Sequence, residues 1–121
     1  MSHGYRDLVV WQKANSLACE VYRMTDGFPK TEAYGLTSQM RRAAVSVASN
    51  IAEGQDRLTK GEFAQFLGHA RGSLLELETQ LDISQDLKFI EQGQFSRIDA
   101  HTAEVLKMLN GLIDSLRVRR Q

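Results

Sequence analysis

Residues that suit a helix core recur at helical spacing in four stretches of the chain, and no stretch alternates apolar and polar residues as a strand does. Steps of three and four place such side chains on one face of a helix. The pattern predicts helices at about residues 7–25, 34–53, 60–87 and 94–117. Their core positions are Val10, Ala14, Leu17, Val21 and Met24; Leu36, Met40, Ala43, Val47 and Ile51; Phe63, Leu67, Ala70, Leu74, Leu77 and Leu81; and Phe95, Ile98, Thr102, Val105, Leu109, Leu112 and Leu116.

The predicted boundaries depend on residues that begin and end helices. Asp7 is the expected N-cap of the first helix, and Pro29 follows its end because a proline disfavours helical backbone just before it. Thr59, with Glu62 three residues later, matches a capping box at the start of the third helix. Gly54 is expected to end the second helix in a left-handed conformation.

Four helices with short links favour an all-α, antiparallel, up-down-up-down four-helix bundle formed by one domain, residues 1–121. Gly68 and Gly72 interrupt the third helix at a cost of about 1 kcal/mol each relative to alanine, so we expect close helix packing to compensate them. In the fourth helix Leu106 and Ile113 widen the apolar stripe. That width predicts contact with the bundle on one side and with another subunit on the other.

Charge narrows the possible functions. The chain has 15 basic and 15 acidic residues, which argues against a nucleic-acid binder of the strongly basic type. The balance is uneven: +2 in residues 1–52, −4 in residues 53–91 and +2 in residues 92–121. Arg117, Arg119 and Arg120 form a basic tail without an acid. The tail is either a solvated end, which is the ordinary case, or an interaction arm.

No catalytic constellation is recognisable. The histidines His3, His69 and His101 lack the spaced partners of a metal site, and the paired Glu-x-x-His motifs of di-iron bundles do not occur. His101 and Glu104 together suggest only a solvated face. There is neither a G-x-S-x-G elbow nor a glycine-rich phosphate loop. We therefore expect no enzyme activity, no cofactor and no metal.

The single cysteine, Cys19, allows no intramolecular disulfide and is expected to be buried and structural. A chain without disulfides suits a reducing compartment. There is no apolar region of the kind found in signal peptides, and no apolar run is long enough to span a bilayer. The sequence therefore predicts a cytoplasmic protein.

Polar residues follow one side of the second and third helices. They are Gln39, Arg42, Ser46, Asn50 and Glu53, then Glu62, Gln65, His69, Ser73, Glu76 and Gln80. In a structural interpretation, which we favour, these two polar stripes meet each other or a neighbouring subunit through hydrogen bonds. In a functional interpretation they line a groove or a ring lumen that binds a ligand. Arg41 points about 100° away from Arg42 and is expected to face outward.

Six motifs occur in order over about residues 5–87. They are Asp7-Leu8-x-x-Trp11-Gln12-x-Ala14, Phe28-Pro29-x-x-Glu32-x-x-Gly35-Leu36, Gln39-x-Arg41-Arg42-Ala43-x-x-Ser46, Asn50-Ile51-Ala52-Glu53-Gly54, Glu62-Phe63-x-x-Phe66-Leu67 and Gly72-Ser73-x-x-Glu76-Leu77. In combination they resemble a family of small bacterial four-helix bundles, named after open reading frames inside intervening sequences of 23S rRNA genes. Residues 46–54 are the most specific part.

The resemblance implies an antiparallel four-helix bundle assembled into a ring-like homopentamer. It also implies a relative with this fold, the accessory protein of diversity-generating retroelements, which partners a reverse transcriptase and binds nucleic acid through a basic surface. Candidate contacts with nucleic acid or a partner are Lys13, Arg41, Arg42, Arg117, Arg119 and Arg120. The positions assigned to structural hydrogen bonding are Gln39, Ser46, Asn50, Glu53, Ser73 and Glu76.

We therefore expect a non-enzymatic oligomeric scaffold that binds nucleic acid or a nucleic-acid-processing protein. The alternative is a purely protein-binding or structural ring with no nucleic-acid contact.

Overall fold

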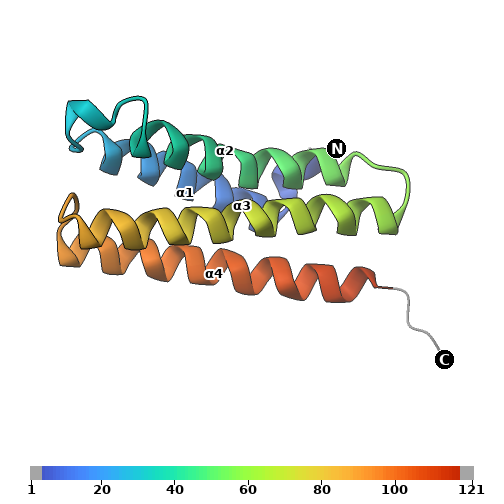
Figure 1. Ribbon diagram of the computed structural model, residues 1–121. Coiled ribbons are helices and arrows are strands. Elements are labelled where there is room, and N and C mark those ends of the chain that lie inside the picture. Colours follow the sequence, from blue (N-terminus) through green and yellow to red (C-terminus); the bar gives the residue numbers. More distant parts are fainter. Residues whose placement is uncertain (1–3, 118–121) are drawn as a thin grey trace.

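The computed structural model describes residues 4–117, and within that range it contains four long α-helices and no strand (Figure 1). The predicted all-α class is confirmed. The helices are α1 (Val9–Thr25), α2 (Leu36–Gln55), α3 (Lys60–Asp86) and α4 (Gln92–Leu116), accompanied by the short 3-10 helices η1 (Gly4–Asp7) and η2 (Lys30–Glu32).

Successive helices run in opposite directions along the bundle (Figure 1). α1 packs against α2 and α4, and α3 packs against the same two helices, whereas the diagonal pairs make no close backbone contact in the described part of the chain. Each helix therefore occupies one corner of a square and buries one broad stripe. None of the helices described is long and apolar enough to cross a membrane.

The predicted stripe positions form the core. Most of them are buried, while the residues at the ends of the stripes, Leu36, Phe63, Phe95, Leu112 and Leu116, are partly buried and pack against it. Burying one large apolar side chain contributes about 1.5–3 kcal/mol, so these stripes are the main source of stability. At one end of the bundle, buried Phe28 lies against Phe89 with 5.5 Å between ring centroids and closes the core.

The start of α3 follows the prediction, but the start of α1 does not. The Thr59 hydroxyl accepts a hydrogen bond from the Glu62 backbone N–H at 3.1 Å and donates to the Glu62 carboxylate at 3.0 Å. Asp7 instead belongs to η1, and Leu8 is the N-cap of α1, without a side-chain hydrogen bond. The entry into α1 is fixed by η1, which packs on α1 and α2, with Tyr5 edge-on to Trp11.

Gly54 has a different role from the predicted one. It lies buried inside α2, and among the described residues only Gly4 and Lys88 have a positive φ. A Cβ at Gly54 would meet Phe66 and Phe63 of α3, so the glycine allows α2 and α3 to approach each other. Lys88 makes the left-handed turn after α3.

The expectation that Gly68 and Gly72 pack closely within the bundle is wrong. Both are exposed, and a Cβ added at either position would have no atom within 4 Å. Gly72 lies on the outer side of α3, whereas Gly68 lines an open hollow of about 760 Å³ between α3 and α4. The chain itself therefore does not compensate their helix-propensity cost.

Candidate functional site

The middle of the two polar stripes is closed by one hydrogen bond between α2 and α3, which a second polar residue of α2 supports. The hydroxyls of Ser46 and Ser73 lie 2.9 Å apart. The Asn50 amide donates to the Ser46 backbone oxygen at 2.9 Å and to its hydroxyl at 3.0 Å. This part of the stripes follows the structural interpretation, since its polar groups satisfy one another.

Towards the start of α2 the same stripes separate and leave a hollow of about 330 Å³, the α2–α3 hollow. Its lining residues are Tyr34, Ser38, Gln39, Arg42, Glu76 and Gln80. The structure gives the Arg42 and Glu76 side chains no ion pair or hydrogen bond within residues 4–117. The hollow thus presents one cation and one carboxylate on opposite helices, and neither forms an ion pair within residues 4–117.

Gln80 is the polar side chain held deepest in this wall. It is only 6% exposed, and its amide oxygen Oε1 is buried without a hydrogen-bond partner in the part of the chain described. The nearby Ser84 hydroxyl donates to the Gln80 backbone oxygen at 2.8 Å instead. A buried acceptor left unpaired costs about 1–3 kcal/mol, and this oxygen is enclosed by the protein and not open to the hollow.

A second hollow adjoins the first at the corner between α1 and α2 and shares Tyr34, Ser38 and Arg42 with it. Tyr34, in the link before α2, is 100% exposed, and Tyr22 on α1 is also exposed. Sequence reasoning did not single out either tyrosine as a functional residue. In the folded chain both tyrosines lie beside arginines. This arrangement depends on how α1 packs against α2, so it cannot be recognised from the sequence of either helix alone.

Arg41 is held in this corner, so the expectation that it faces outward is wrong. Its Nε donates to the Thr25 hydroxyl at 2.8 Å, and one terminal nitrogen donates to Asp26 at 3.1 Å. Its guanidinium lies over the Tyr22 ring at 4.6 Å, and the side chain is only 27% exposed. The end of α1 supplies these acceptors on the Arg41 side of α2, which leaves Arg42 as the exposed arginine.

The other candidate basic residues do not join this surface. Lys13 pairs with Glu104 of α4 at 3.4 Å, and Arg117 lies 3.7 Å from Asp114. Arg117 follows the end of α4, which is at the opposite end of the bundle from the start of α2 (Figure 1). Arg119 and Arg120 lie outside the described residues. Among the candidate basic residues that the structure describes, only Arg41 and Arg42 lie together.

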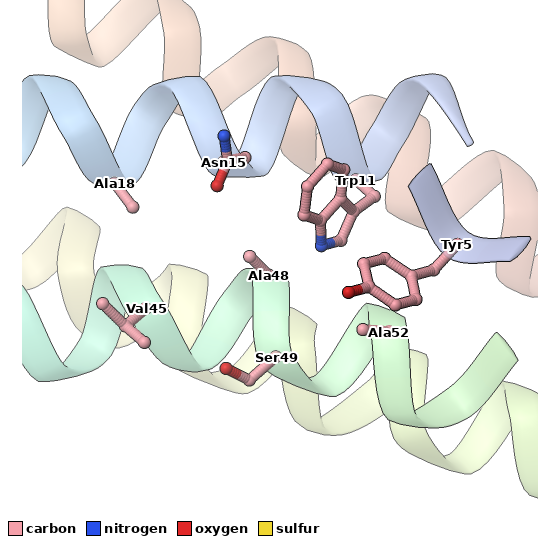
Figure 2. Close-up of a pocket in the computed structure, with 8 residues that line it drawn as sticks. All are labelled: Tyr5, Trp11, Asn15, Ala18, Val45, Ala48, Ser49 and Ala52. Carbon is pink, nitrogen blue, oxygen red and sulfur yellow. The ribbon is translucent and has the colours of Figure 1, made fainter. Parts of the chain in front are cut away.

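Another groove lies between α1 and α2, with Tyr5 and Trp11 at one end and small side chains along both helices (Figure 2). It measures about 250 Å³, and no charged residue lines it. The lining residues are Tyr5, Trp11, Asn15, Ala18, Val45, Ala48, Ser49 and Ala52. This groove is concave like the α2–α3 hollow, but it lacks the charged residues that line that hollow.

Two further sequence interpretations need correction. Cys19 is exposed, because it lies on the side of α1 opposite Val10, Leu17 and Val21. His101 is half-buried and contacts the Glu20 carboxylate across the α1–α4 interface instead of facing solvent beside Glu104. No group of three or more metal-ligating side chains gathers within residues 4–117.

Comparison with known proteins identifies the family. The chain is similar to the crystal structure of a protein with unknown function from the S23 ribosomal protein family of Bacteroides thetaiotaomicron. The two are 22% identical, with a TM-score of 0.79 over 87% of this chain and 98% of that one, a likeness that concerns the fold. No curated protein matches the chain. The model of the 23S rRNA-intervening sequence protein family matches residues 6–111, and the chain belongs to that family, as its motifs indicate.

Proposed function

We propose that this protein is a non-enzymatic helical scaffold that binds single-stranded nucleic acid at the start of α2. The observation that supports this function is the pair formed by Tyr34, whose side chain is fully exposed, and Arg42, whose guanidinium is exposed and has no acidic partner within residues 4–117. Exposed aromatic rings stack on unpaired bases, and arginines contact phosphates. Both residues line the same two adjoining hollows.

The neutral net charge makes a single copy a weak binder, so the proposal includes self-association. The family resemblance implies a ring-like homopentamer, in which five copies of Arg42 would engage one strand together and raise the avidity. Each contact with a phosphate of a single strand lowers the logarithm of the association constant by about 0.7 for every tenfold rise in salt concentration. We place this assembly in the cytoplasm, since a chain with one unpaired cysteine suits a reducing compartment.

The exposed surface of α3 supports association between copies. Gly61, Gly68 and Gly72 have no neighbouring atoms where their Cβ atoms would be, and exposed Leu75 and Ile83 extend the same side of the helix. A helix of a second copy could approach such a surface closely and compensate the glycines. Light scattering should then give about 68 kDa, five times the 13.6 kDa chain mass. A mass near that of one chain would reject the ring.

Binding is tested with fluorescently labelled RNA and DNA single strands of mixed sequence. Anisotropy should show binding at about 50 mM salt that weakens as salt rises. Tyr34→Ala should weaken it by roughly 5-fold or more, in line with the loss of one stacking contact. Arg42→Gln should weaken it and also reduce its salt dependence. If the unmodified protein retains neither strand at low salt, the proposed function is wrong.

A matched control separates local contacts from charge. Arg97 is an exposed arginine of α4, and α4 does not contact α2. Arg97→Gln removes the same charge as Arg42→Gln and should leave the affinity within about 2-fold. Equal losses in the two variants would mean that the start of α2 is not the contact surface.

The second candidate is a protein-binding or structural ring without nucleic-acid contact. The uncharged groove between α1 and α2 favours it, because small side chains there leave room for a helix of another protein (Figure 2). A mass of about 68 kDa together with no retention of nucleic acid would select this function.

A further inference from the structure

We propose that the α2–α3 hollow holds one unstacked base of the bound strand and selects guanine. This inference rests on the proposed function and adds the base that the site prefers. The hollow combines a carboxylate, a cation and an aromatic residue at one location, with Gln80 in its wall. At about 330 Å³ it falls within the range of small-molecule sites, roughly 300–1,000 Å³.

The α3 wall supplies one accessible carboxylate, that of Glu76. Glu76 and Gln80 are four residues apart on α3, so their side chains are neighbours on one side of the helix. The Glu76 carboxylate is exposed and accepts no hydrogen bond from residues 4–117, whereas the Gln80 amide oxygen is enclosed by the protein. A ligand that presents two neighbouring N–H donors would match the two oxygens of the Glu76 carboxylate.

Guanine is the base whose edge fits that requirement. Its N1–H and N2 amino group lie side by side and can donate two charge-assisted hydrogen bonds to one carboxylate. Adenine and cytosine place a ring acceptor beside their amino group, and uracil places its N–H between two carbonyl oxygens. With any of these three bases, Glu76 would face an acceptor, which costs free energy instead of gaining it.

The α2 wall argues against a competing ligand, the lysine or arginine side chain of a partner protein. Such a side chain would satisfy Glu76, but it would also meet the unpaired positive charge of Arg42 across the hollow. A guanine nucleotide instead offers Arg42 either its O6 atom or its phosphate, both of which are acceptors. Tyr34, also in the lining, supplies a ring on which the base can stack.

Base preference is measured with the full chain and uridine-rich RNA strands of about ten nucleotides that carry one central G, A, C or U. The strand with guanine should bind roughly 10-fold more tightly than the others, within the range for one bidentate contact. Replacing that guanine by inosine, which lacks the N2 amino group, should remove most of the preference. Equal affinity for all four strands would overturn guanine selection while leaving the proposed function in place. Failure to bind any strand would overturn both.

A variant assigns the preference to this hollow. Glu76→Gln keeps the size of an exposed side chain but replaces one acceptor oxygen by a donor, so the ratio of guanine to uridine affinity should fall to within about 2-fold. The matched control is Glu53→Gln, an exposed acid of α2 outside the hollow, which should keep the full ratio. A full ratio in Glu76→Gln would show that guanine is read elsewhere and would reject this site.

Discussion

Gly54 of α2 faces Phe66 of α3 so closely that a Cβ atom at position 54 would lie 2.8 Å from the Cβ of Phe66. Such an atom would also lie 2.9 Å from the Phe63 ring and 3.3 Å from the Phe63 backbone oxygen. A Cβ and a backbone oxygen cannot rotate out of the way, unlike the end of a flexible side chain. The absent side chain of Gly54 therefore sets the distance between the two helices beside their connecting loop.

We expect Gly54→Ala to lower the free energy of unfolding by about 1–3 kcal/mol, as overpacking does in other cores. A loss of stability would be informative, because helix propensity alone favours alanine over glycine inside a helix by about 1 kcal/mol and would raise the free energy of unfolding. Urea denaturation followed by circular dichroism measures the change. Gly111→Ala is the control: this glycine of α4 has open space at its Cβ, so the substitution should stabilise the protein. An equally stabilised Gly54→Ala would contradict the close approach.

The exposed glycines of α3 test where the proposed assembly forms. Gly68→Leu places a large side chain where the chain itself leaves open space, so helix content should be unchanged. If another copy approaches α3 here, the added side chain blocks it, and the mass measured by light scattering should fall towards that of one chain. Gly111→Leu makes the same change on α4 and should retain the assembly. An unchanged mass for Gly68→Leu would exclude this side of α3 as the interface.

The adjacent arginines Arg41 and Arg42 should separate stability from binding. Arg41→Gln loses hydrogen bonds to Thr25 and Asp26, and a hydrogen bond to a charged group is worth about 1.5–3 kcal/mol. We expect a loss of stability near the lower end, since Asp26 is exposed and water replaces part of that contact. Arg42→Gln should change stability by less than about 0.5 kcal/mol, as exposed substitutions usually do. Thermal unfolding of the two variants measures this difference. Equal stabilities would contradict the structural role of Arg41.

The sequence predicted the features that depend on local spacing. Buried Leu67, Leu74 and Leu81 follow a periodicity that any helix imposes, so the stripes could be predicted without knowing their partners. The role of Gly54 was not predicted. A glycine near a helix end suggests a left-handed turn, but Gly54 is a glycine because Phe66 of α3 leaves no room for a Cβ atom. The same limit applied to Arg41, since its direction around α2 was predictable but the acceptors at the end of α1 were not.

The candidate site was predicted only in part. The polar stripes that contain Ser46, Ser73 and Glu76 follow from helical geometry. Their division into a hydrogen-bonded middle and a hollow at one end depends on how α2 and α3 pack together, which spacing along one helix does not encode. Tyr34 was not recognised because the predicted helix of residues 34–53 included it, whereas it lies in the link before α2, and its place beside Arg42 depends on the fold.

Glu78 should make stability depend on pH. Partial burial on α3 raises the pKa of this carboxyl above its ordinary value of 4.5, and the negative charges of Asp99 and Asp82 raise the pKa further. A raised folded-state pKa means that the folded protein holds this proton more tightly than the unfolded chain. The ionised carboxylate therefore opposes folding at every pH above the folded-state pKa, and this penalty disappears as the pH falls below the unfolded-state pKa.

Glu78→Gln removes the charge and should raise the free energy of unfolding at pH 7, with an advantage that shrinks as the pH is lowered and vanishes below about pH 4.5, where both states of the original protein carry the proton. Urea midpoints measured from pH 4 to pH 7 in about half-unit steps check this course. Glu53→Gln, an exposed acid on α2, serves as the control and should give nearly the same midpoints as the unmodified chain. A Glu78→Gln advantage of equal size at every pH would show that the amide stabilises the protein by packing, and the electrostatic account of Glu78 would then be wrong.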